Sequence, residues 1–185
     1  HDYWGTRTII ANDISQFVNV DNAGNWKKNT SELQDKFGNN KLEFLKQYKF
    51  NLCAENILTD AYVTEKIFDA ISCDCIPLYA GGGNYLEPEV INPKAVIRWD
   101  AVPHVTHDTE MKRRGYYGYD AHERVKWMVD DDRNSDAIEL FENLLTDEKS
   151  YNEFKDQDKV MESSTKFINN KFKMLEKHFE RLIYS

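Results

Sequence analysis

The sequence predicts an α/β fold in which helices flank a parallel, Rossmann-like sheet, with a helical C-terminal tail. Short apolar segments at residues 48–54, 75–79 and 95–99 alternate with segments of helical periodicity. This strand–helix–strand order is typical of right-handed crossovers in a parallel sheet. From residue 136 onward the apolar residues follow a helical period. A chain of 185 residues is long enough to form a single core.

The N-terminal part supplies the first helices of this arrangement. Residues 6–17 carry apolar side chains at helical spacing, and Thr6 stands where a helix cap is expected. A polar loop follows through residues 19–25, and a short helix is predicted over residues 40–47. Residues 48–54 alternate in polarity and are enriched in aromatic side chains, which predicts a strand.

The middle of the chain continues with one helix and two strands. The helix is predicted from about Val63 to Ser72. The apolar run at 75–79 predicts a strand, in which we expect Cys73 and Cys75 to share a face. The last strand is predicted over residues 95–99.

The C-terminal part has a different character. Residues 102–132 are aromatic and polar without a clear period, so we expect an insertion there. The last predicted helix carries an apolar stripe, which favours packing on the sheet or on a partner domain over membrane contact. The predicted helices of this part are His122–Asp131, Asp136–Leu145, Tyr151–Met161 and Thr165–Leu182.

Composition excludes several classes of function. The formal net charge of -8 argues against a general nucleic-acid binder, which needs a basic face, but a few placed cations can still hold a nucleotide. The sequence contains no apolar run long enough to span a membrane. Three cysteines are too few for a disulfide framework, which favours a reducing compartment.

A polar cluster stands where a strand ends and the next helix begins. Glu55 and Asn56 follow the predicted strand, and Tyr62, Glu65 and Lys66 surround the helix start. Ligands of open parallel sheets bind beyond the carboxyl ends of the strands, and a helix N-terminus attracts phosphate. A cation in the first helical turn opposes the helix dipole, so Lys66 indicates a nearby anion. A first-turn acid and a solvated lysine are the structural alternative.

The chain resembles the α1,3/α1,4-fucosyltransferase family through several ordered blocks. The resemblance covers residues 7–100 well and residues 136–154 faintly. Upstream of the main blocks, Arg7, Ile14, Ser15, Phe17, Val20, Asp21 and Gly24 are similar to the helix and turn that precede them in the family. The main blocks are Tyr48–Asn56, Tyr62–Ile67, Ile76–Gly81 and Asn92–Lys94.

The resemblance implies that this chain is the C-terminal, GDP-fucose-binding half of a GT-B glycosyltransferase. Its donor-binding residues would be Arg7, Asn56, Tyr62, Glu65 and Lys66. Arg7 falls on the family's phosphate arginine, and a guanidinium can bind two phosphate oxygens at once. No essential metal is implied, and GDP-fucose is the donor substrate.

The implied reaction is an in-line displacement that inverts the fucose anomeric carbon. The acceptor is a glycan hydroxyl, which we expect to be the 3-hydroxyl of GlcNAc. A general base deprotonates it. That base belongs to the family's N-terminal acceptor domain, so no catalytic residue is expected in this chain, which would be inactive without that domain. The resemblance also implies that the first strand of the donor domain lies outside the chain.

The expected domains are a donor-binding unit at residues 1–160, with the insertion at about 102–132, and a C-terminal helix at 161–185. This helix would pack on the donor unit or on the N-terminal domain. The location would be the cytoplasm for a bacterial or viral source, which the cysteines favour, and the Golgi lumen for a eukaryotic one.

Two readings other than a fucosyltransferase stay open. Ala54 stands where the family usually has a large aromatic residue, which leaves room for another nucleotide sugar. A nucleotide-sugar-binding module without transfer activity is the second alternative.

Other motifs favour structural roles. The acidic run Asp130–Asp132 is typical of a solvated helix end. His104 and His107, with Cys73 and Cys75, match no tight metal-binding spacing. The glycines that follow residue 80 lack a dinucleotide fingerprint and predict a turn near a nucleotide. Asn29 begins a glycosylation sequon that acts only in a secretory lumen.

Overall fold

The computed structural model describes residues 2, 5–56, 62–81, 86–100 and 134–184. Within these residues the strands form one parallel, three-stranded sheet in the order β1-β2-β3. The strands are β1 (Phe50–Ala54), β2 (Ile76–Ala80) and β3 (Ile97–Arg98). β2 is buried along its whole length, and β1 is an edge strand in the described part of the chain.

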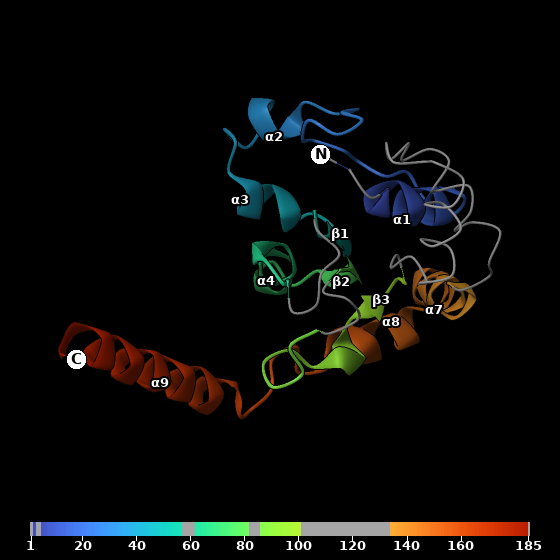
Figure 1. The fold of residues 1–185 in the computed structure, drawn as a ribbon. Coiled ribbons are helices and arrows are strands. Elements are labelled where there is room, and N and C mark those ends of the chain that lie inside the picture. Colours follow the sequence, from blue (N-terminus) through green and yellow to red (C-terminus); the bar gives the residue numbers. More distant parts are fainter. Residues whose placement is uncertain (1, 3–4, 57–61, 82–85, 101–133, 185) are drawn as a thin grey trace, which may run out of the picture.

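Helices cover both faces of this sheet (Figure 1). Alternate residues of β2 point to opposite faces, so Ile76, Leu78 and Ala80 pack with α1 and α7, while Tyr79 packs with α3 and α4. Two separate apolar clusters result, and the sheet lies between them. The helices are α1 (Thr6–Ser15), α2 (Glu32–Asp35), α3 (Lys41–Leu45), α4 (Glu65–Ser72), α7 (Ser135–Thr146), α8 (Glu148–Lys155) and α9 (Ser164–Tyr184), with a 3-10 turn η2 (Pro93–Ala95).

The start of α1 differs from the predicted cap. Gly5 is the N-cap residue, and Thr6 lies inside the helix with its hydroxyl buried and without a partner among the described residues. The carboxylate of Asp2 instead accepts hydrogen bonds from the backbone N–H groups of Arg7 (2.9 Å) and Thr8 (3.0 Å). Asp2 therefore caps the first turn from outside the helix.

The cysteines near β2 lie in a turn, so their predicted place in a strand is wrong. α4 ends at Ser72, Cys73 is its C-cap residue, and Asp74 adopts a positive φ of 61° that reverses the chain before β2. The Cys75 Sγ lies within hydrogen-bond distance of two backbone carbonyls, those of Leu45 (3.3 Å) and Tyr48 (3.2 Å), and its single S–H can donate to either. Burial raises the pKa of this thiol to about 11, so Cys75 acts as a neutral packing group.

Helix α8 is shorter than predicted because the chain after it becomes extended. Val160 forms an antiparallel bridge with Ile91, and the Asn92 N–H donates to the Lys159 carbonyl at 2.9 Å. These bonds hold residues 158–161 against the segment before η2, which a continued helix could not do. The expected insertion at 102–132 and the predicted helix at 122–131 lie outside the described residues.

Helix α9 leaves the sheet and extends to one side of the molecule (Figure 1). Its apolar stripe stays largely exposed, with Phe172 at 65% of its full surface. Among the described residues, no helix combines the length and apolar character needed to cross a bilayer.

Candidate donor-binding site

The carboxyl end of β1 and the start of α4 meet at one edge of the sheet. Glu55 follows β1, and its backbone N–H donates to the Ala80 carbonyl at 2.9 Å, which continues the β1–β2 pairing by one residue. Thr64, in an extended conformation, precedes the first turn of α4. This is the position at which ligands of parallel sheets bind.

A buried carboxylate connects these two elements. The Glu55 side chain is 0% exposed, and its Oε1 accepts a hydrogen bond from the Thr64 backbone N–H at 2.8 Å. Its Oε2 accepts from the Thr64 hydroxyl at 2.7 Å and from Lys66 Nζ at 2.9 Å. Lys66 Nζ also donates to Thr64 Oγ1 at 2.9 Å. Every polar atom of the Glu55 side chain is therefore paired, as burial of a charge requires.

This network changes the interpretation of Lys66. The sequence indicated that a cation in the first turn of α4 needs a nearby anion. In the structure that anion is Glu55, so the place of Lys66 in the helix does not by itself require a phosphate. The Lys66 side chain keeps 16% of its surface exposed. Its charge is therefore both anchored and accessible.

Arg7 reaches the same edge from the first turn of α1. Its Nη2 donates to Asn56 Oδ1 at 2.9 Å, which joins two of the predicted site residues. The Asp2 cap fixes the backbone of Arg7 in the first helical turn. The structure thus brings Arg7 and Asn56 together although 49 positions separate them in the sequence.

A cleft of about 710 Å³ contains both cations in its lining. It follows the side of β1 that pairs with no other strand in the described residues, and the loop at residues 18–26 lines its other side. Arg7 and Lys66 come from helices on opposite faces of the sheet, and both line this one cleft. Its polar part includes Arg7, Glu65 and Lys66, and its apolar part includes Ile14, Val18, Phe50, Leu52, Phe141 and Leu145.

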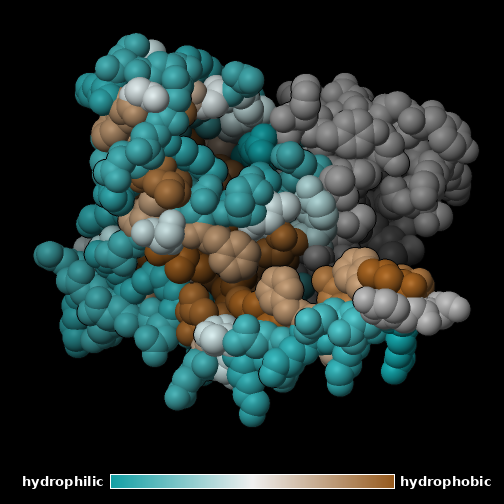
Figure 2. Space-filling model, turned by 90° about the vertical axis from the view of Figure 1, so that its left-hand side faces the viewer, coloured by the Kyte–Doolittle hydropathy of each residue, from teal (hydrophilic) through white to brown (hydrophobic). Residues whose placement is uncertain are grey.

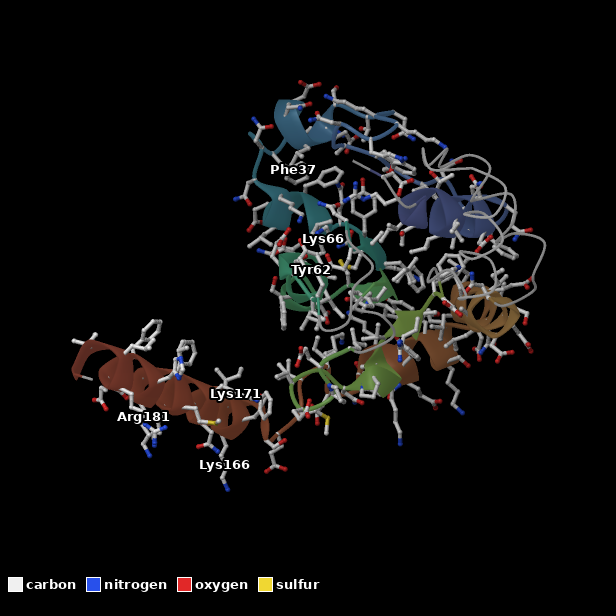
Figure 3. The ribbon with its side chains drawn as sticks, in the orientation of Figure 1. Phe37, Tyr62, Lys66, Lys166, Lys171 and Arg181 are labelled. Carbon is white, nitrogen blue, oxygen red and sulfur yellow. The ribbon has the colours of Figure 1, made fainter. Side chains whose placement is uncertain are left out.

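The remaining predicted residues lie close to this cleft in different ways. Glu65 lines it with a side chain that is 68% exposed. A hydrogen bond from its own backbone N–H holds the pKa of Glu65 below the ordinary value, and Lys66 lowers it further, so this carboxylate is ionised at neutral pH. Tyr62 is half-buried at the same end of α4 as Lys66 (Figure 3), but it is not part of the cleft lining.

Three residues of this edge were missing from the predicted site. Glu55 and Thr64 were recognised only as members of the polar cluster, and Gly81 only as part of a turn near a nucleotide. The signal for Glu55 was a carboxylate directly after a buried strand, because such a charge needs partners. Gly81 has a φ of +154°, and a Cβ there would lie 2.4 Å from Glu55 Cγ, so only glycine permits this close approach.

The other motifs contribute no site in the described residues. Asp130–Asp132, His104 and His107 lie outside them, and no group of metal-ligating side chains occurs in the part of the chain that the structure covers. Cys73 and Cys75 are buried and unpaired. The Asn29 side chain donates to the Val20 carbonyl at 2.8 Å and accepts from the Asn22 N–H at 2.7 Å, so it shapes the loop that closes the cleft.

Known proteins share both the sequence and the fold of this chain. An α-(1,3)-fucosyltransferase FucT of Helicobacter pylori is 50% identical over 58 residues, which are 31% of this chain and 12% of that protein. An α-(1,3)-fucosyltransferase C of Drosophila melanogaster is 38% identical over 79 residues, 43% of this chain and 18% of that protein. The chain therefore spans less than a fifth of the length of these relatives.

Solved structures agree with the sequence relatives. A crystal structure of α1,3-fucosyltransferase with GDP-fucose superposes with a TM-score of 0.56 at 27% identity, over 85% of this chain and 36% of that one. The same enzyme type with GDP gives a TM-score of 0.51 at 26% identity, over 82% of this chain and 34% of that one. These neighbours confirm the predicted fold class, a Rossmann-like part of a GT-B glycosyltransferase.

A family model agrees with both comparisons and matches more than half of the chain. Residues 2–111 match the C-terminal region of "Glycosyltransferase family 10 (fucosyltransferase)". This range contains β1, α4, β2 and all the predicted donor-binding residues. The chain belongs to glycosyltransferase family 10, the fucosyltransferases.

Proposed function

We propose that this chain binds GDP-fucose and forms the donor half of a fucosyltransferase that acts on a glycan hydroxyl. The observation that carries the proposal is that Arg7 and Lys66 line one cleft, with Arg7 bonded to Asn56 just after β1 and Lys66 in the first turn of α4. Two cations and a helix start match the charge of a diphosphate. In the finer form of the proposal, fucose is joined α1,3 to GlcNAc with inversion.

Arg7 and Lys66 would act by electrostatics. As the bond between fucose and GDP breaks, negative charge grows on the diphosphate, and placed cations stabilise it without reorganisation. Asn56, Tyr62 and Glu65 would orient the ribose, the diphosphate or the fucose. Because Glu65 is an exposed, ionised carboxylate, it suits sugar hydroxyl donors better than phosphate oxygens.

The general base and the acceptor site would belong to an N-terminal domain, so residues 1–160 bind the donor and need that domain for transfer. Two observations support a further partner. Among the described residues β1 pairs on one side only, and the apolar part of the cleft beside Phe50 and Leu52 suits an additional parallel strand, apart from the cations. The apolar stripe of α9 is exposed, which suits a domain packed against residues 161–185.

Calorimetry on the full protein tests the donor assignment. We expect heat with GDP and GDP-fucose, weaker binding of GDP-mannose, and none of UDP-sugars. Lys66→Ala should weaken the binding of GDP much more than the binding of guanosine, because guanosine lacks the diphosphate. Chelation of divalent ions should leave GDP binding unchanged, since no essential metal is proposed. Absence of heat and of a thermal shift with GDP-fucose would end the assignment.

A different nucleotide sugar is the second candidate, and one observation favours it. Ala54 is completely buried at the end of β1, where the family usually carries a large aromatic side chain. Ala54 packs in the core beneath the cleft and is not part of its lining, so its smaller side chain would act on the donor through the packing of β1. Tighter binding of another nucleotide sugar in the same titrations would support this candidate, and donor binding without transfer to any glycan would support a binding module.

We propose two locations, the cytoplasm for a bacterial or viral source and the Golgi lumen for a eukaryotic source. The buried, unpaired cysteines are compatible with the first.

A further inference from the structure

We propose that Glu55 is a positioning residue of the donor site, which holds Lys66 and the start of α4 in the geometry that receives the diphosphate. This inference rests on the proposed function. It assigns a role to a side chain outside the predicted set of Arg7, Asn56, Tyr62, Glu65 and Lys66.

Glu55 itself has little conformational freedom. Its backbone is held by the hydrogen bond to the Ala80 carbonyl, and its side chain is fully buried. Gly81 passes so close that a Cβ at that position would lie 2.6 Å from Glu55 Cβ. The residues at the end of β2 therefore pack closely around this carboxylate and hold it in one position.

Glu55 also fixes the position of the first turn of α4. Its two oxygens bind the backbone N–H and the hydroxyl of Thr64, and one of them also binds Lys66 Nζ. Thr64 is the N-cap residue, but its own side chain makes no cap hydrogen bond within the helix. The helix start is therefore tied to the end of β1 through Glu55. A phosphate at this helix N-terminus would depend on that tie.

The ammonium group of Lys66 is held in place with donor capacity left over. An ammonium group has three N–H donors on a flexible four-carbon stem. Glu55 Oε2 and Thr64 Oγ1 take two of these donors, each at 2.9 Å. The third donor makes no hydrogen bond within the described residues, and Glu65 Oε1 lies 3.8 Å from Nζ, so this donor can bind a ligand in the cleft that Lys66 lines. A lysine anchored in this way loses less conformational entropy when it binds a phosphate oxygen.

Two other roles would explain the same contacts. Glu55 could be a purely structural partner, or it could compete with the diphosphate for the Lys66 charge. The three roles differ in what they predict for variants that keep the charge. Thr64→Val removes one anchor of Lys66 without changing any charge, and Glu55→Asp keeps the carboxylate but shortens its reach by one methylene.

The experiment titrates GDP and guanosine into the full protein and records thermal unfolding for each variant. We expect Thr64→Val and Glu55→Asp to weaken GDP binding by about three- to tenfold, the effect of losing one ordinary hydrogen bond that positions Lys66. Guanosine binding should stay within about twofold of wild type. Tyr79→Phe, which removes a buried hydroxyl without a partner among the described residues, should bind GDP as wild type does.

Each outcome decides the matter. Equal weakening of GDP and guanosine, together with a lower unfolding temperature, would show a structural role only and overturn the inference. Unchanged or tighter GDP binding in Glu55→Asp and Thr64→Val would also overturn it. If wild-type protein bound no GDP, the proposed function would fail as well. If Lys66→Ala weakened the binding of GDP but not of guanosine, while the Glu55 and Thr64 variants bound GDP normally, only the present inference would fail.

Discussion

The donor-site edge, where β1 ends and α4 begins, buries and pairs a charged side chain, whereas helix α9 leaves apolar side chains exposed. At the edge, the buried carboxylate of Glu55 finds all its partners within the described chain. On α9, large apolar side chains such as Phe172 and Phe179 remain more than half exposed. Figure 2, which views the side from which α9 projects, shows apolar residues gathered above a row of polar ones. Within the described residues the Glu55 charge is fully paired, whereas the apolar side chains of α9 are left uncovered.

The largest effect on stability is expected from a substitution of Phe141, which packs against β1 in the core between the sheet, α1 and α7. Phe141 is 1% exposed in α7 and makes edge-to-face contacts with Phe17, Phe50 and Trp99. Phe141→Ala should lower the free energy of unfolding by about 3–5 kcal/mol, because it leaves a cavity under β1. Urea unfolding followed by circular dichroism measures this change. A loss below about 1 kcal/mol would show that the region is as loosely packed as α9.

Gly81 should show the next largest effect. An alanine Cβ would lie 2.4 Å from Glu55 Cγ, at a φ of +154° that L-residues avoid. Gly81→Ala should therefore destabilise by about 3 kcal/mol, through overpacking and backbone strain. Gly24→Ala is the matched control, because nothing lies within 4 Å of its Cβ, and it should change stability by less than about 0.5 kcal/mol. Equal effects of the two changes would contradict the close packing at Glu55.

Features with a strong local sequence pattern could be predicted, and features that depend on tertiary contacts could not. β1, α4 and β2 have strong local patterns, and their predicted bounds differ from the observed ones by only a few residues. The Arg7–Asn56 contact could be predicted only from family resemblance, because no local pattern connects residues so distant in sequence. The partnership of Glu55 with Lys66 was missed because an exposed anion and a buried one look the same in a sequence. The end of α8 was missed because a tertiary contact, Ile91 with Val160, stops that helix.

Asp13 gives a smaller effect that depends on pH. Its carboxylate accepts a hydrogen bond from Trp99 Nε1 at 2.8 Å, and partial burial raises its pKa above the ordinary value although this bond lowers it. The folded state then holds the proton more tightly than the unfolded state does. The contribution of Asp13 to stability is therefore greatest below its unfolded pKa and falls as pH rises through the folded pKa.

Asp13→Asn tests this sign, because an amide oxygen can keep the Trp99 bond without titrating. We expect wild type to lose stability relative to Asp13→Asn between about pH 4 and pH 7, measured as the difference between their urea midpoints at each pH. A difference that stays constant over this range would show that burial does not perturb Asp13.

The smallest effect in this chain is expected on α9. Phe172→Ser and Phe179→Ser should each change the free energy of unfolding of the 185-residue chain by less than about 0.5 kcal/mol, because both side chains are already exposed. In the complete protein the same pair should lower the unfolding temperature, since the proposed partner domain would cover the stripe. Lys166→Ser and Arg181→Ser, on the side of α9 that points away from the sheet (Figure 3), are the controls and should change neither protein. If the phenylalanine variants destabilised the 185-residue chain as much as the complete protein, α9 would pack on its own donor unit, and the contrast between the two regions would disappear.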